Sequence, residues 1–237
     1  MIKCPIMKTS RVLVLFLLLF IFSKAESQKI PKGYKVVYEQ SFDNEEGLKD
    51  FTFSQTDKWK LSEGKKGKAL EFTGISDYQP PFRSPHTLGF INHLSVGSFV
   101  LQADLLQTGK EYGHRDMCIA FGLQDPAHFY YAHMATKMDD NAHQIMLVNG
   151  APRAKISTFT TEGINWGEEK WHQVQVERNI EEGSIKIYFD GKLIEEAKDK
   201  TFGAGFIGFG SFDDSGKIDN IKVWAVDSRK KELAFYK

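Results

Sequence analysis

Residues 172–196 read HQVQVERNIEEGSIKIYFDGKLIEE, and this stretch decides the fold of the chain. Apolar side chains recur in it at every second position, as at Val174 and Val176. A period of two is that of a β-strand, whose successive side chains point to opposite faces of a sheet. Asp190 and Gly191 separate two such runs, where a two-residue hairpin needs residues that tolerate positive φ. The stretch therefore predicts three strands, the last two joined by a tight turn.

The same pattern extends over most of the chain, and no long stretch has the i, i+3, i+4 spacing of an amphipathic helix. Alternating or β-branched runs occupy residues 34–38, 69–72, 98–105, 117–123, 129–134, 144–148, 154–159, 172–176, 185–189, 192–196, 206–209 and 218–226. A second two-residue hairpin is predicted at Asn149-Gly150. We therefore expect an all-β protein of two packed antiparallel sheets, with one domain over residues 34–226 and a short basic tail at 227–237.

Composition excludes several classes of protein. Of the 237 residues, 41% are hydrophobic and 13% aromatic, which suits a globular domain and excludes disordered, collagen-like and coiled-coil chains. Lys and Arg together number 31, as do Asp and Glu, so the formal net charge is zero. Because a nucleic-acid-binding protein is expected to carry a basic surface, this balance argues against a nucleic-acid partner.

The N-terminus has the features of a secretory signal peptide over residues 1–25. Lys3, Lys8 and Arg11 are followed by the apolar run 12–22, which is shorter than the about 20 residues of a membrane-spanning helix. We expect cleavage after residue 25, with an uncleaved membrane anchor as the alternative. The mature chain would then have no integral membrane span and would be secreted or located in the periplasm or cell envelope.

Cleavage would remove Cys4 and leave Cys118 as the single thiol, so the mature chain could form no intramolecular disulfide. An exported protein without disulfides is more typical of bacteria than of animal extracellular modules. We therefore expect a bacterial protein whose stability comes from its hydrophobic core.

Several segments resemble the concanavalin A-like jelly-roll domains. The opening segments are YEQSFD at 38–43, Trp59 and GKAL at 67–70, and the closing segments are WHQVQV at 171–176, IYFDGK at 187–192 and residues 208–223. This superfamily includes laminin-G-like modules, legume-type lectins, glycan-binding modules, glucanases and polysaccharide lyases. The resemblance implies a two-sheet antiparallel jelly-roll sandwich that binds glycans across its concave sheet, with calcium near the convex side or the sheet edge. It implies no particular activity, because the fold has both catalytic and purely binding members.

Histidines are concentrated between residues 114 and 143. Alternation along 117–123 places the apolar side chains on one face and leaves His114 and Asp116 on the other. The same argument for the following run places Tyr131 and His133 on that second face. We expect these four side chains to share one cleft, and His143 to join them from the next strand.

Imidazoles beside a carboxylate and a phenol suit proton transfer near neutral pH. By resemblance to polysaccharide lyases of this fold, such a cleft would act by β-elimination, with Arg115 or Arg153 neutralising a uronate carboxylate. The sequence lacks both the E-x-D-x-E strand of the glucanase branch and the R-x-E-x-R and Q-I-H motifs of the alginate-lyase branch. Elimination is therefore favoured over hydrolysis if the protein is an enzyme at all.

Other interpretations of this segment stay open. The first alternative is that the histidines are ordinary polar residues on a sheet face. The others, in order, are a non-catalytic glycan cleft and a transition-metal site. A zinc site needs three or four His, Cys or carboxylate ligands. The candidate set is His114, Asp116, His133 and His143.

Two further features suggest binding. Trp166 is flanked by polar and small residues in a predicted loop, which favours an exposed platform for stacking on a sugar ring. Asp43 and Asp219 lie in the first and last segments, which meet in many jelly rolls, and offer oxygen ligands for a structural calcium ion. The alternative is that both carboxylates only stabilise turns.

These observations predict a secreted protein that binds a polysaccharide or oligosaccharide on the concave sheet face. The alternatives are a lyase that uses the His/Tyr cleft and a non-catalytic interaction module of the cell envelope. No cofactor is required by any of them, and structural calcium is the candidate ion.

Overall fold

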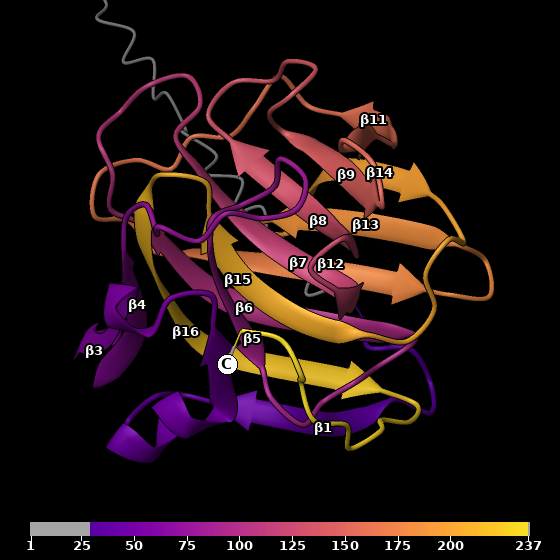
Figure 1. The fold of residues 1–237 in the computed structure, drawn as a ribbon, viewed down its shortest axis with the longest axis horizontal. Coiled ribbons are helices and arrows are strands. Elements are labelled where there is room, and N and C mark those ends of the chain that lie inside the picture. The colour runs from indigo at the N-terminus through magenta and orange to yellow at the C-terminus, as the bar shows by residue number, and fades with distance from the viewer. Residues whose placement is uncertain (1–28, 237) are drawn as a thin grey trace, which may run out of the picture.

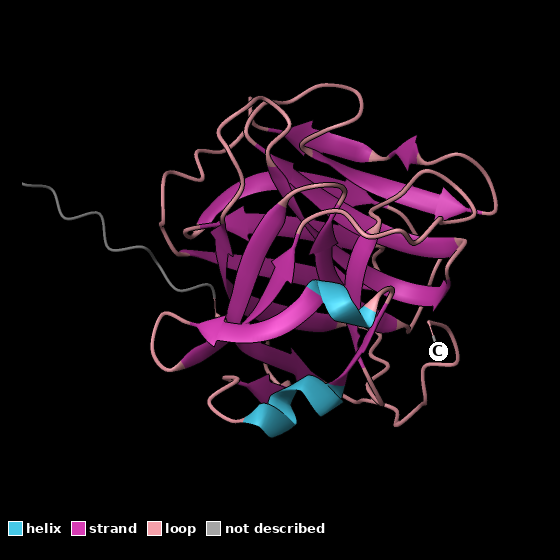
Figure 2. Ribbon diagram, turned by 60° about the vertical axis from the view of Figure 1, so that its left-hand side comes forward, coloured by secondary structure: helices cyan, strands magenta, loops and turns pink. Residues whose placement is uncertain are grey.

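Two antiparallel sheets packed face to face make up the computed structural model, which describes residues 29–236 (Figure 1). The nine-stranded sheet runs in the order β11 (Ser157–Thr160), β14 (Lys192–Lys198), β13 (Ser184–Phe189), β12 (His172–Asn179), β6 (Phe99–Gln107), β16 (Ser215–Ala225), β4 (Lys68–Thr73) and β3 (Trp59–Glu63), and β1 (Lys35–Gln40) also pairs with β16. The seven-stranded sheet runs in the order β10 (Ala154–Lys155), β9 (Gln144–Asn149), β8 (His128–Ala135), β7 (Asp116–Asp125), β15 (Phe206–Ser211), β5 (Thr87–Ile91) and β2 (Phe51–Phe53). Two short 3-10 helices, η1 (Glu45–Asp50) and η2 (Thr56–Lys58), accompany the sheets (Figure 2).

This arrangement confirms the predicted all-β, two-sheet jelly roll. Each predicted run lies in a strand, and the run 154–159 is divided between β10 and β11. The sequence pattern missed the short strands β2, β3 and β5. The predicted hairpin at Asp190 and Gly191 is confirmed, because both residues have positive φ, 49° and 77°, and directly join β13 to β14. The predicted two-residue turn at Asn149 is wrong, since β9 ends at this residue and β10 begins only at Ala154.

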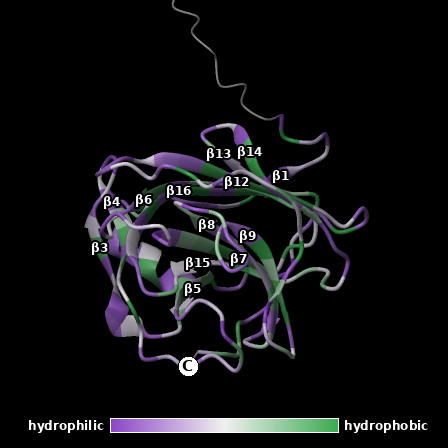
Figure 3. Cartoon of the chain, turned by 90° about the horizontal axis from the view of Figure 1, so that it is seen from above, coloured by the Kyte–Doolittle hydropathy of each residue, from purple (hydrophilic) through white to green (hydrophobic). Residues whose placement is uncertain are grey.

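The main core fills the space between the sheets, which lie one above the other in Figure 3. Met117, Ile119 and Phe121 of β7 point into it, as the alternation predicts, and Val176 of β12 reaches it from the opposite sheet. These side chains are all buried. Because these side chains of β7 are buried in the core, the alternate side chains of β7 lie on the outer surface of the seven-stranded sheet.

That outer surface carries a second apolar cluster, which includes Leu88, Phe90 and Phe129. The last described residues cover part of it. Tyr236 stacks on Phe90 with ring centroids 5.6 Å apart and an interplanar angle of 4°. Upstream of this contact, the backbone of Arg229 pairs with that of Ser95. Residues 227–236 therefore pack against the sandwich.

The predicted signal peptide, residues 1–25, lies outside the described residues. Within residues 29–236, the structure contains no helix with the length and apolar character needed to cross a bilayer.

Candidate functional site

A cleft of about 480 Å³ opens on the outer face of the seven-stranded sheet. Its lining combines strand residues of β7 and β8 with residues of the surrounding loops: Arg83, Tyr112, His114, Asp116, His133, Asn141, Arg153, Phe212 and Asp213. The predicted shared face is thus confirmed for His114, Asp116 and His133. Tyr131 lies on the same face, since it packs in the outer cluster, but its side chain is completely buried.

Asp116 and His133 form a buried pair at the floor of the cleft. His133 Nε2 lies 2.8 Å from Asp116 Oδ2, and His133 Nδ1 lies 2.8 Å from the backbone carbonyl oxygen of Asn141. A carbonyl oxygen can only accept, so Nδ1 carries a hydrogen. The other carboxylate oxygen of Asp116 accepts a hydrogen bond of 2.6 Å from Ser211 Oγ. Both side chains are thereby fixed in position.

Arg153 lies beside this pair. Its Nη1 donates to the Tyr131 hydroxyl at 2.8 Å, and its guanidinium carbon lies 4.8 Å from the ring centroid of Phe212. The guanidinium of Arg83 lies 5.9 Å from the same centroid. Within residues 29–236, neither arginine forms an ion pair with a carboxylate. Burial raises the pKa of the Tyr131 phenol, and the positive charge of Arg153 offsets part of this rise.

Further carboxylates lie next to Asp116. The Asp116 backbone amide donates to Asp214 Oδ2 at 2.8 Å, and the Tyr112 hydroxyl donates to the same oxygen at 3.0 Å. Burial raises the pKa of Asp214 to about 6, and the neighbouring charges of Asp116 and Asp213 add to this rise. The cleft therefore combines unpaired arginines at its rim with a concentration of acidic groups at its floor.

His143 does not join the cleft, and that prediction is wrong. The residue precedes β9 with φ of 56°, so the alternation of the strand does not extend to it, and its side chain is completely buried. Its Nε2 lies 2.9 Å from Thr161 Oγ1, and its Nδ1 lies 3.5 Å from Glu195 Oε1. Burial lowers the pKa of His143 to about 4, and the nearby charge of His133 contributes. His114 is exposed at the cleft rim, where its Nε2 lies 2.7 Å from Asp139 Oδ2.

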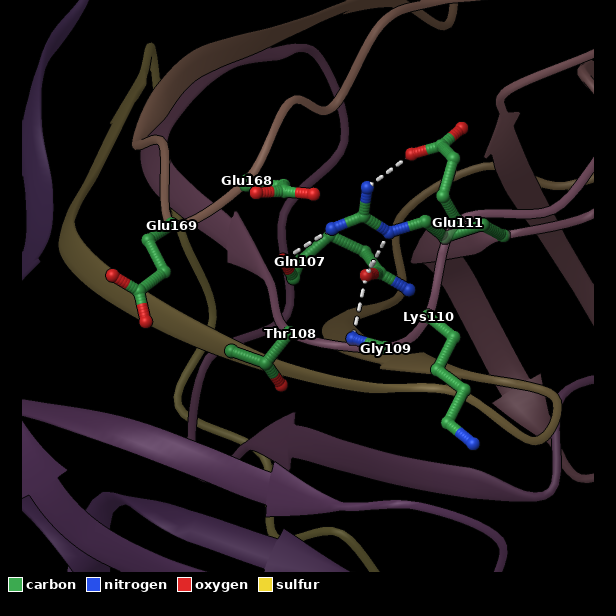
Figure 4. Close-up of a pocket in the computed structure, with 8 residues that line it drawn as sticks. Gln107, Thr108, Gly109, Lys110, Glu111, Glu168 and Glu169 are labelled. Atoms are coloured by element: carbon green, nitrogen blue, oxygen red, sulfur yellow. Dashed lines mark hydrogen bonds and ion pairs between the residues drawn. The ribbon is translucent and has the colours of Figure 1, made fainter.

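Arg115 points away from the cleft. Its guanidinium is buried and donates to Gln107, Glu111 and the carbonyl oxygen of Gly167. The residue lines a second pocket, which Figure 4 shows, and three other side chains of that pocket, Glu111, Glu168 and Glu169, are acidic. Because Nε, Nη1 and Nη2 of Arg115 all donate within the protein and the residue lines the other pocket, it has no role in the cleft, contrary to the prediction.

Trp166 is also not the exposed platform that the sequence predicts. Its side chain is completely buried, and its ring packs against His172 and Phe189. The Trp166 carbonyl oxygen lies 2.9 Å from His172 Nε2, which holds the loop against the sandwich. The polar and small residues next to Trp166 in the sequence predicted exposure, because they give no information on this tertiary contact.

The two aspartates predicted to bind calcium lie at the nine-stranded sheet. Asp43 is exposed and accepts from Ser41 Oγ at 2.9 Å. Asp219 is buried, and its oxygens accept from the backbone amides of Lys65 and Asn220. Burial raises the pKa of Asp219, and the charge of Asp43 is close enough to contribute. The calcium site stays a prediction.

Sequence reasoning missed several residues of the cleft. Phe212 and Asp213 directly follow β15, and Arg83 lies in a loop between β4 and β5. None of them belongs to an alternating run. Cys118 lies on the same face of β7 as Asp116 and directly opposite His133 in the strand register, and the predicted set of zinc ligands does not include it.

Comparison with known proteins gives matches in structure alone, since no family model and no curated protein matches the sequence. The carbohydrate-binding module CBM66 from Bacillus subtilis is similar with a TM-score of 0.51 and 18% identity, over 73% of this chain and 93% of that one. Domain 4 of the extracellular arabinanase AbnA from Geobacillus stearothermophilus, solved with arabinotriose, has a TM-score of 0.51 and 15% identity, over 83% and 94%. Lectin I-B4 from Griffonia simplicifolia has a TM-score of 0.51 and 10% identity, over 81% and 99%. The protein thus has the lectin-like jelly-roll fold that carbohydrate-binding modules and lectins share.

Proposed function

We propose that the protein is an exported glycan-binding protein and that the cleft on the seven-stranded sheet is its binding site. The observation that carries the proposal is the pair of arginines, Arg83 and Arg153, which face the cleft without a carboxylate partner. A guanidinium group is planar and presents several donors in a fixed arrangement, which suits the oxygen-rich surface of a sugar. Asn141 and Tyr112 add neutral polar groups at the same rim.

Similarity of fold supports this proposal. The similar structures include a carbohydrate-binding module, an arabinanase domain and a lectin. We infer that the chain belongs among the concanavalin A-like proteins, that the seven-stranded sheet is the concave one, and that residues 1–25 direct export. A ligand in such a cleft is expected to contact a few precisely placed polar groups together with an apolar surface, which Phe212 provides here.

The geometry favours binding over β-elimination. A general base must reach the proton that it removes, within about 2.6 to 3.2 Å. Both ring nitrogens of His133 already contact protein oxygens, and its side chain is only 4% exposed. Tyr131 is completely buried, receives a hydrogen bond from Arg153 and has a raised pKa. Neither group is therefore available to act as a base on a bound uronate.

Affinity electrophoresis against neutral, uronic and sulfated polysaccharides tests the proposal. Wild-type protein is expected to be retarded by at least one polymer, and Arg153→Ala to weaken binding by about tenfold or more, since a hydrogen bond to a charged group contributes about 1.5–3 kcal/mol. Lys155→Ala is the matched control, because Lys155 is a nearby cation that pairs with Asp140 and does not line the cleft.

Absence of retention by every polymer would reject glycan binding and favour the interaction module. Equal retention of wild type and Arg153→Ala would reject this cleft as the site. Circular dichroism of each variant checks that the sheets are intact.

A further inference from the structure

We propose that Asp116, Cys118 and His133 form a site for a transition-metal ion of the zinc type at the floor of the cleft. The ligand atoms of these three side chains all lie within 4.8 Å of one another, and all three side chains are buried. The proposal does not rest on glycan binding, since it concerns the protein side of the cleft alone.

The strand pairing places the three ligands on one face. Asp116 and Cys118 are two residues apart on β7, so their side chains point the same way, and His133 of β8 lies directly opposite Cys118. Cys118 Sγ lies 3.8 Å from Asp116 Oδ1, and His133 Nε2 lies 2.8 Å from Asp116 Oδ2. Zinc bonds of about 2.0–2.3 Å in tetrahedral geometry separate neighbouring ligand atoms by roughly 3.3–3.8 Å. To admit the ion, the 2.8 Å contact between His133 Nε2 and Asp116 Oδ2 would have to widen by about 0.5 Å.

The hydrogen bonding of His133 supports this assignment independently. Its Nδ1 hydrogen is donated to the Asn141 carbonyl oxygen, so the lone pair of the neutral ring is on Nε2. That lone pair faces a carboxylate oxygen of Asp116 at 2.8 Å. Two acceptors at this distance need a proton between them, and a bound metal ion would replace that proton as the two side chains moved apart. Histidines that bind metals commonly donate their other ring nitrogen to a backbone carbonyl, as here.

Charge and ligand type define the class of ion. A thiolate, a carboxylate and a neutral imidazole together cancel the charge of a divalent cation, which suits a buried site. Sulfur and nitrogen ligands favour zinc and related transition metals, whereas calcium and magnesium prefer oxygen ligands. Asp116 also belongs to a second group with Asp213 and Asp214. The three ligands leave the fourth tetrahedral position for solvent or for Asp213, which is exposed in the same cleft.

Titration of the metal-free protein with Co²⁺ tests the site. A sulfur-to-cobalt charge-transfer absorption in the near ultraviolet is expected at one equivalent, together with visible bands of tetrahedral intensity. Zn²⁺ is expected to displace Co²⁺ and to remove both sets of bands. Cys118→Ser should abolish the charge-transfer band, and His133→Gln should weaken Co²⁺ binding by at least about tenfold.

One control variant separates this site from other sources of binding. His114→Gln removes an exposed imidazole of the same cleft that is not in the trio. It should keep the band and the affinity. Thermal unfolding of metal-free Cys118→Ser and His133→Gln checks that they fold. No charge-transfer band in the wild type, or a band that survives in folded Cys118→Ser, would overturn the proposal.

Discussion

Replacing Glu195 by Gln should stabilise the protein at neutral pH. Glu195 on β14 is completely buried, and neither of its carboxylate oxygens has a hydrogen-bond partner within the described chain. His143 is an ionisable neighbour, and its Nδ1 lies 3.5 Å from Glu195 Oε1 and also lacks a hydrogen bond within the described residues. Burial raises the pKa of Glu195 well above 4.5. The folded protein therefore favours the neutral carboxyl.

The size of the effect follows from the proton balance. A raised pKa means that the folded state holds a proton that the unfolded state releases above pH 4.5. Each pH unit between 4.5 and the raised pKa contributes 1.36 kcal/mol, so the cost at pH 7 has an upper limit of about 3 kcal/mol. The contribution of neutral Glu195 is thus fully present below pH 4.5 and is lost as the pH rises. Gln has the same shape and no such cost, and its amide can donate to His143 Nδ1.

Urea unfolding followed by tryptophan fluorescence between pH 4 and pH 8 measures this difference. We expect Glu195→Gln to be more stable than wild type at pH 7, by up to about 3 kcal/mol, and to gain almost nothing at pH 4. Glu196→Gln is the matched control, because the next residue on β14 is partly exposed and lies 3.8 Å from Lys186. Its effect should stay within about 0.5 kcal/mol at every pH. A loss of stability in Glu195→Gln at pH 7 would refute the reasoning, since it would show that an ionised His143–Glu195 pair had been broken.

Three other perturbations have defined outcomes. His143 has a pKa lowered to about 4, so its neutral form contributes to the free energy of unfolding above pH 6.5, and this contribution is lost as the pH falls towards 4. In urea titrations, His143→Gln should therefore reduce the loss of stability between pH 6.5 and pH 4 by about 3 kcal/mol. Gly210→Ala would place a Cβ atom 1.8 Å from a backbone carbonyl oxygen of β5 and should lower the free energy of unfolding by about 3 kcal/mol or more. Gly203→Ala is the control, because no atom lies within 4 Å of its added Cβ, and it should leave thermal unfolding nearly unchanged. Deleting residues 228–237 removes the stacking of Tyr236 on Phe90 and should expose the outer apolar cluster, so binding of a hydrophobic dye should increase. The far-ultraviolet circular dichroism spectrum should stay that of a β-protein, and unchanged dye binding would contradict the packing of this segment.

Strand alternation in the sequence correctly predicted which side chains of a regular strand face the core. In β7 and β8 it correctly assigned Met117 to the core and Asp116 and His133 to the outer face, because one face of each strand is buried in the sandwich. It failed for His143, whose backbone leaves the extended conformation just before β9 begins. The alternation of side chains therefore predicts their direction only within the extended part of a strand.

Loop residues escaped the prediction for a different reason. Phe212 and Arg83 reach the cleft from separate loops, and the contact between them exists only once the sheets are assembled. Trp166 shows the converse case, a loop residue buried by a distant strand. Tertiary packing of irregular segments leaves no periodic trace in the sequence.

The position of β16 constrains the order of events during synthesis. This strand ends at residue 225, yet it pairs with β1, β4 and β6, which all precede residue 108. A ribosome delivers the N-terminal partners first, so the edge of β6 that faces β16 has no hydrogen-bonding partner until residues 215–225 have emerged. Such non-local pairing slows folding and leaves open strand edges exposed to aggregation in the meantime. Completion of the nine-stranded sheet therefore waits for β16, and a nascent chain truncated before residue 215 would be a substrate for chaperones and proteases.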